Sequence, residues 1–228
     1  MKAWFPLGRV LGIQVRVNIS FVLIMALFTW LFYAQSIELM GVTIGFGDLG
    51  APPLARLLLS VLLAILFFAG VLAHELAHSY VALRQGHRVR AITLFIFGGV
   101  SQIEDMPEQP GEEFRMAVAG PATSLAIGAT LYGVNGGLLA IGARGTVAGE
   151  AMLVIVGTLA FYNVLLGLFN LIPAFPTDGG RILRSAMATR TDHLTATHWA
   201  ANVGKGVAIA MALFVVGIFV QKRVRRAR

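Results

Sequence analysis

Two histidines and a glutamate interrupt a long apolar run in the first half of the chain. His74, Glu75 and His78 follow the pattern His-Glu-x-x-His inside this run. In an α-helix, residues four positions apart lie one turn apart on the same face, so both imidazoles can bind one metal ion. Glu75 then lies beside the ion, where its carboxylate can accept a proton from water. The spacing therefore predicts a zinc-dependent hydrolytic centre.

A catalytic zinc ion takes three protein ligands and leaves one position open for water. Asp178 is the candidate for the third ligand, because it follows an apolar run in a stretch that Pro173 and Pro176 keep from being helical. Non-helical backbone at membrane depth must line protein or a water-filled cavity. Two other roles stay open for Asp178, a helix cap or an ion pair with Arg181. The carboxylates between residues 104 and 113 belong to a polar loop and are weaker candidates.

The composition is that of a membrane protein. Of the 228 residues, 57% are hydrophobic and 13% are charged, whereas a soluble domain carries about a quarter charged residues. Several apolar runs approach the ~20 residues that cross ~30 Å of hydrocarbon. We expect an all-α, multi-pass protein with about five to six transmembrane helices, forming a single membrane-embedded domain over residues 1–228. Cysteine is absent, which excludes a thiolate zinc site.

Hydrophobic periodicity and helix-breaking residues predict where helices and strands lie along the chain. Apolar runs predict membrane helices at about residues 19–34, 52–84, 112–132, 151–170 and 196–220, separated by loops that include 38–51 and 133–149. Alternation of apolar and polar residues predicts a small β element at about residues 9–18, with a hairpin turned at Gly12. The segment of residues 91–100 is too short to cross the membrane as a helix, and its composition predicts a strand or a membrane-dipping hairpin. An amphipathic segment is expected at 181–190.

The distribution of basic residues predicts which end of each helix faces the cytosol. With the N-terminus in the cytosol, the basic patch at residues 84–90 is also cytosolic, and the 38–51 loop, which has no lysine or arginine, is outside. The metal motif then lies about 15 Å below the cytosolic end of its helix. Five spans would place the basic C-terminal tail outside, against the same rule. Basic residues at span ends account for the net charge of +7, so we expect no nucleic-acid partner.

Two patterns together resemble the site-2 protease family of intramembrane zinc metalloproteases. These are His74-Glu75-x-x-His78 and Asn170-x-x-Pro173-x-x-Pro176-x-Asp178-Gly179-Gly180. Phe97-Gly98-Gly99-Val100 and Gly120-Pro121-x-x-Ser124 extend the resemblance, which covers roughly residues 8–205. The layout is similar to the compact archaeal and bacterial branch, here without PDZ or CBS modules. Thr177 departs from the family's more usual Leu or Met before Asp-Gly.

The resemblance implies a role for each matched residue. One zinc ion per chain would be bound by His74, His78 and Asp178, and Glu75 would act as general base. Asn170 would donate a hydrogen bond to the oxyanion that forms during hydrolysis. Further residues are candidates for substrate binding, each with packing or an interhelical hydrogen bond as the alternative: Gly98, Gly99, Asn163 and Ser124.

The predicted function is an endopeptidase that cleaves single-span membrane proteins near the cytosolic side of a prokaryotic cell membrane. The family association suggests membrane-tethered transcription factors or anti-sigma factors as substrates. Residues 91–100 either offer an edge strand to an unwound substrate or form a structural hairpin. Three alternatives remain: a metal transporter that uses the same His, His and Asp site, an inactive scaffold, and a zinc protease with its site at the membrane surface.

Overall fold

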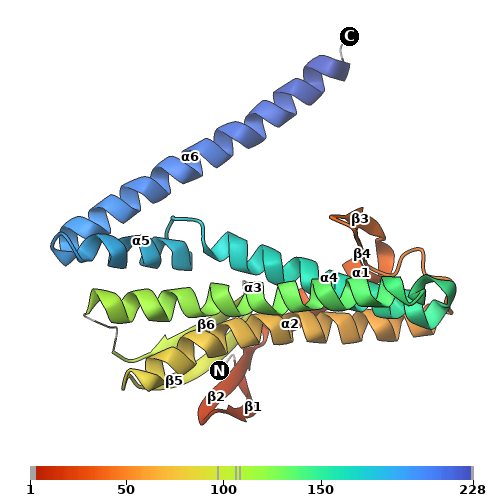
Figure 1. Ribbon diagram of the computed structural model, residues 1–228, viewed down its shortest axis with the longest axis horizontal. Coiled ribbons are helices and arrows are strands. Elements are labelled where there is room, and N and C mark those ends of the chain that lie inside the picture. Colours follow the sequence, from red (N-terminus) through yellow and green to blue (C-terminus); the bar gives the residue numbers. More distant parts are fainter. Residues whose placement is uncertain (1–3, 97, 106, 108, 227–228) are drawn as a thin grey trace. The chain divides into compact units, whose positions relative to one another are not determined.

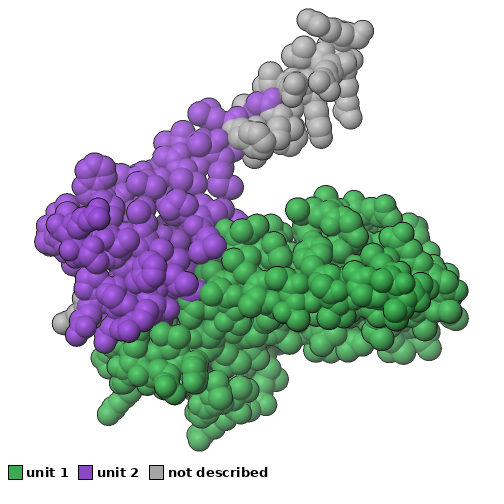
Figure 2. Space-filling model, in the orientation of Figure 1, with its two compact units in different colours: residues 1–106, 119–168 green, residues 107–118, 169–228 purple. Residues whose placement is uncertain are grey.

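The computed structural model describes residues 4–96, 98–105, 107 and 109–226, which form six α-helices and six strands (Figure 1). The chain divides into two compact units (Figure 2). Unit 1 comprises residues 1–106 and 119–168, and unit 2 comprises residues 107–118 and 169–228. The predicted fold class, a mostly helical chain with a small β element, is confirmed.

A four-stranded sheet in unit 1 contains both predicted β segments. Its strands β1 (Trp4–Val10), β2 (Ile13–Asn18), β5 (Val89–Phe95) and β6 (Gly98–Ile103) follow the order β1-β2-β5-β6. The β1–β2 hairpin turns at Leu11 and Gly12, which have φ of 52° and 80°, the left-handed geometry that suits tight hairpins. β2 pairs with β5 in parallel, and β5 pairs with β6 in antiparallel. Residues 91–100, predicted as a strand or a hairpin, belong to two antiparallel strands, so the hairpin alternative is confirmed. β6 forms one edge of the sheet.

Unit 1 also holds α1 (Ser20–Ala34), α2 (Pro53–Arg84), most of α4 (Val147–Asn170) and the part of α3 (Pro110–Ala140) from Ala119 onward. α2 starts with proline in its first turn, where the missing N–H is not needed, as the Pro52-Pro53 pair predicted. The core joins these helices through buried side chains that include Phe32, Leu63 and Val154.

Two predicted loops in unit 1 are more ordered than the sequence suggested. Residues 38–51 contain a hairpin of β3 (Ile37–Leu39) and β4 (Val42–Ile44), whose Val42 and Ile44 side chains are buried in the core. α3 continues through the glycine-rich residues 133–140, because the buried Asn135 donates a hydrogen bond to the Leu153 carbonyl at 3.1 Å. A contact with another helix thus offsets the low helix propensity of glycine.

Three helices are long and apolar enough to cross a membrane among the residues that the structure describes: α2, α3 and α4. α1 has 15 residues and extends only ~22 Å, which is shorter than the hydrocarbon core. By helix length and hydropathy, three of the predicted five to six membrane spans are therefore identified among the described residues. The chain is an integral membrane protein.

Unit 2 contains the first turns of α3, the end of α4, α5 (Asp178–Ala188) and α6 (His193–Arg226). The predicted break is confirmed, because α4 ends at Asn170 and residues 171–177 are turns and bends. The amphipathic helix predicted from 181 begins three residues earlier, at Asp178. α5 and α6 pack against each other within this unit.

Candidate metal centre

Helix α2 brings the two motif histidines together inside unit 1. His74 and His78 are 3% and 5% exposed, and their Nε2 atoms lie 3.2 Å apart. The four-residue spacing places both rings on one face of the helix. Two imidazole nitrogens that converge in a buried position form half of a tetrahedral zinc site.

The backbone of α3 closes over the two imidazoles at Gly120. A Cβ atom built on Gly120 would lie 2.2 Å from Nε2 of His78 and 2.7 Å from Nε2 of His74. No side chain fits at these distances, so only glycine allows the two helices to approach this closely. Residue 120 therefore adds no side chain beside the two Nε2 atoms.

Ser124, one turn after Gly120 on α3, supports the first histidine. Its Oγ lies 2.9 Å from Nδ1 of His74, and its side chain is fully buried. When the Nδ1 proton is donated to this hydroxyl, Nε2 keeps its lone pair for a metal. Ser124, predicted as a substrate-binding residue, is thus in contact with the first motif histidine.

The residues present fit the zinc ion that the motif implies. His74 and His78 of unit 1 are buried imidazoles, and Asp178 of unit 2 offers a carboxylate oxygen as a ligand atom. Nitrogen and carboxylate donors in this combination are typical of catalytic zinc sites. The supporting serine supplies the outer hydrogen bond that zinc-binding histidines ordinarily make.

The carboxylate of Glu75 is held by the sheet. Ser101 of β6 donates a hydrogen bond to its Oε2 at 2.8 Å, and Ser79 of α2 donates to Ser101 at 3.1 Å. Gly99 passes so close that a Cβ there would lie 2.6 Å from Cγ of Glu75. Sequence reasoning identified Gly99 but missed Ser101. The signal was the strand period of two, which places residues 99 and 101 on the same face.

The other two candidates of unit 1 lie in different surroundings. Gly98 begins β6 with φ of 120°, and nothing lies within 4 Å of an added Cβ. Asn163 of α4 is 4% exposed, and its Nδ2 donates to the Leu159 carbonyl of the same helix at 2.8 Å. Among the described residues its Oδ1 has no hydrogen-bond partner, and its amide faces Gly70 of α2, one turn before His74. Asn163 therefore brings a buried acceptor to the motif helix.

Unit 2 presents Asp178 at the first position of α5, directly after the break. The hydroxyl of Thr177 donates to the carbonyl oxygens of Ile172 and Ala174, at 2.6 Å each. A Cβ on Gly179 would lie 2.2 Å from the Ile172 oxygen, so the turn requires glycine. The break is thus a tight backbone turn that leads from α4, whose last residue is Asn170, into α5.

Comparisons with known proteins agree with this geometry. The family model described as Peptidase family M50 matches residues 62–138 and 134–215. Rip3 of Mycobacterium tuberculosis is 40% identical over 221 residues, covering 96% of this chain and 53% of its own length. MJ0392 of Methanocaldococcus jannaschii, named a zinc metalloprotease, is 34% identical over 214 residues, covering 91% of this chain and 52% of its own length. The chain thus spans about half the length of these relatives.

A solved structure is also similar. The site-2 protease from Methanocaldococcus jannaschii superposes with a TM-score of 0.59 at 31% sequence identity, covering 97% of this chain and 88% of that chain. The match of the family model runs from within α2 into α6 and so includes both halves of the predicted site. From these matches and the His-Glu-x-x-His geometry we conclude that the chain belongs to peptidase family M50, the site-2 protease family of membrane-embedded zinc metalloproteases.

Proposed function

We propose that this protein is a zinc endopeptidase that hydrolyses peptide bonds inside the membrane. One observation carries the proposal: two buried imidazole nitrogens converge at 3.2 Å beneath Gly120, and the carboxylate of Glu75 follows directly on the same helix. The family relationship supports the same reaction. We also propose that the two compact units act as one membrane-embedded protease domain.

The zinc ligands in this proposal are His74, His78 and Asp178. They offer two imidazole nitrogens and one carboxylate oxygen, a ligand set that leaves a fourth position open. When bound, zinc supplies Lewis acidity that lowers the pKa of water and polarises the scissile carbonyl. Because residue 120 is glycine, α3 contributes no side chain at this position beside the two histidines.

Glu75 transfers the proton during hydrolysis. Its carboxylate takes a proton from the attacking water and later delivers it to the nitrogen of the leaving amine. The hydrogen bond from Ser101 to Oε2 orients the carboxylate. The side-chain amide of Asn170 donates to the carbonyl oxygen as negative charge develops there.

Strand β6 is proposed to hold the substrate. It is one of the two edge strands of the four-stranded sheet, and it contacts Glu75 through Gly99 and Ser101. A substrate helix must unwind before its amides can be cleaved, and pairing with an edge strand satisfies the freed backbone in the membrane. Gly98 leaves room for an added strand, because nothing lies within 4 Å of an added Cβ there. Gly99 and the buried amide of Asn163 are further candidate contacts.

The substrate class is a single-span membrane protein cut near the cytosolic side, such as a membrane-tethered transcription factor or an anti-sigma factor. Support comes from the charge distribution, since the basic residues 84–90 follow the motif end of α2 and the 38–51 segment has no lysine or arginine. We place the protein in a prokaryotic cell membrane with its N-terminus and active site toward the cytosol.

Separate measurements of zinc content and cleavage test the mechanism. Glu75→Gln is expected to retain zinc and lose cleavage of a co-expressed single-span substrate. His74→Ala and Asp178→Ala are expected to lose both. Glu104→Gln, which removes an exposed ion pair with Arg90, serves as the control and should retain both. Cleavage that survives Glu75→Gln would contradict the proposal. Zinc flux into vesicles by that variant would indicate a transporter, and a wild-type protein without zinc would indicate a scaffold.

A further inference from the structure

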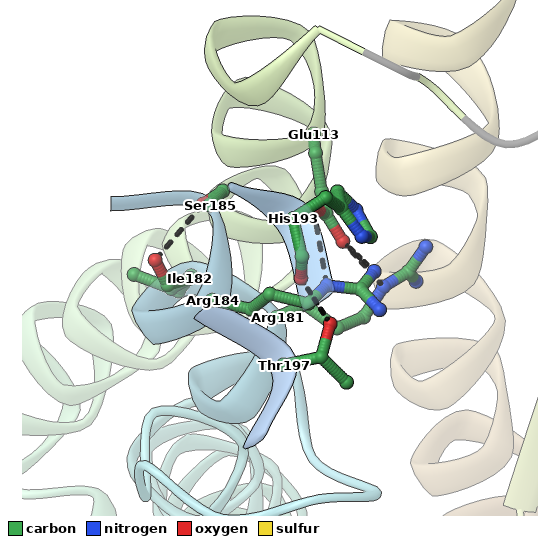
Figure 3. A network of polar contacts seen from close by, with 7 residues as sticks. All are labelled: Glu113, Arg181, Ile182, Arg184, Ser185, His193 and Thr197. Atoms are coloured by element: carbon green, nitrogen blue, oxygen red, sulfur yellow. Dashed lines mark hydrogen bonds and ion pairs between the residues drawn. The ribbon is translucent and has the colours of Figure 1, made fainter. Parts of the chain in front are cut away.

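A buried ion-pair network in unit 2 holds α5, the helix that begins with Asp178. Glu113 lies in the first turn of α3 and is only 2% exposed. Arg184 of α5 binds this carboxylate with two nitrogens, Nη2 to Oε1 and Nε to Oε2, the latter at 3.3 Å. The Nε of Arg181 lies 4.0 Å from Oε1. Figure 3 shows both guanidinium groups turned toward the carboxylate.

Because Glu113 is buried, its carboxylate requires well-placed charged partners and hydrogen bonds. A carboxylate removed from water is strongly disfavoured unless charged partners and hydrogen bonds replace its hydration. The planar guanidinium of Arg184 meets this need with two parallel hydrogen bonds, which also fix its direction. α5 therefore cannot turn about its axis without uncovering a buried charge.

Both arginines lie close to Asp178 along α5. Arg181 follows Asp178 by one turn and Arg184 by almost two, ~4.5 and ~9 Å along the helix axis. The backbone before the helix is also restrained, because a Cβ on Gly180 would lie 2.8 Å from the Phe175 nitrogen. The turn sets where α5 begins, and the Glu113 network sets the rotation of the helix. The two restraints together determine the direction of the side chain at position 178.

We propose that Glu113 is a positioning residue for the zinc ligand Asp178, acting through Arg184 and Arg181. It restrains the rotation of α5, so that the Asp178 carboxylate points in one direction before zinc arrives. The proposal rests on the assignment of Asp178 as a ligand in the proposed function. It predicts that zinc affinity depends on a carboxylate that is not itself a ligand.

A double-mutant cycle on the full-length protein in detergent tests this role. Zinc affinity is measured by competition with a chelator for wild type, Glu113→Gln, Asp178→Ala and the double variant. Glu113→Gln keeps the shape but removes the charge, and it should weaken zinc binding about 10- to 100-fold, as loss of a ligand's supporting partner does. In the Asp178→Ala background the same change should have no further effect, because the ligand that it positions is gone.

Further variants separate positioning from general stability. Glu113→Asp retains the charge and should recover most of the affinity. Arg184→Lys retains a cation but loses the paired hydrogen bonds, and it should weaken zinc binding even if Glu113→Gln does not fold. Glu104→Gln breaks an exposed Glu–Arg pair and is the matched control, expected to leave zinc affinity unchanged. With Co²⁺ in place of zinc, the visible absorption spectrum of Glu113→Gln should change.

The outcomes distinguish this inference from the proposed function. If Glu113→Gln lowers only the melting temperature of the metal-free protein and leaves zinc affinity and the cobalt spectrum unchanged, the inference is overturned and the protease proposal stands. An equal loss of affinity in the Asp178→Ala background would also overturn it, since Glu113 would then act on the histidines or on the fold. If wild type binds zinc but Asp178→Ala binds it equally well, the ligand assignment fails and the inference fails with it.

Discussion

The histidine pair and the segment around Asp178 are held in different ways. His74 and His78 lie on α2, a helix of 32 residues, and are covered by the backbone of α3 and supported by one serine. Asp178 begins an 11-residue helix that follows a turn and is restrained by an ion-pair network. Packing against backbone thus holds two of the proposed ligands, and polar side-chain contacts hold the third.

This difference separates a rigid half of the site from an adjustable half. The spacing of the histidines is set by the helical repeat and by a contact that allows no side chain, so it changes little unless the packing itself is disrupted. The direction of α5 depends on a few polar groups, which can be altered singly. We therefore expect a substitution that disrupts the backbone packing over the histidines to abolish zinc binding. Substitutions of single polar groups are expected to weaken zinc binding or the local backbone without abolishing it.

The largest effect is expected from Gly120→Ala. The new Cβ would meet both Nε2 atoms at 2.2 and 2.7 Å, and relief of such overpacking costs about 1–3 kcal/mol and displaces at least one imidazole. Zinc content of the purified protein, measured by elemental analysis, should fall to background. Gly136→Ala on the same helix is the control, since nothing lies within 4 Å of its Cβ. Full zinc occupancy in Gly120→Ala would show that the histidine half is not rigid.

A smaller effect is expected from Ser124→Ala. Removal of the hydroxyl that lies 2.9 Å from Nδ1 of His74 leaves the ring without its partner, and zinc affinity should fall roughly 10- to 100-fold. Chelator competition measures the change. Thr130→Ala removes an exposed hydroxyl that donates to the Ala126 carbonyl of the same helix, and it should leave zinc affinity unchanged. An unaltered affinity in Ser124→Ala would mean that packing alone orients His74.

The smallest effect is expected from Thr177→Val, which removes the hydroxyl but keeps the shape. Loss of its bonds to the Ile172 and Ala174 carbonyls should destabilise the turn by about 0.5–1.5 kcal/mol. Hydrogen exchange should then quicken across residues 171–180 and stay unchanged in α2. Thr189→Val, at the other end of α5, removes an exposed hydroxyl and is the control. Faster exchange around His74 would show that the two halves are not independent.

Much of the fold followed from local pattern. The Pro52-Pro53 start of α2, the end of α4 at Asn170 and the alternating residues 13–18 of β2 each matched the prediction, because proline geometry and side-chain periodicity act over a few residues. The β3–β4 hairpin and the glycine-rich end of α3 were missed. Both are stabilised by contacts with distant parts of the chain, which local propensity does not reveal.

Within the candidate site, the motif histidines and Glu75 could be predicted, but the groups that hold them could not. The sequence determined that His74 and His78 share a helix face and that the chain breaks before Asp178, because both properties depend on neighbours within one or two turns. Only the tertiary structure decided that Ser124 meets His74, that Ser101 orients Glu75 and that Glu113 binds Arg184. These partners are separated by 50, 26 and 71 residues, and such pairings depend on how helices and strands pack, which no local spacing encodes.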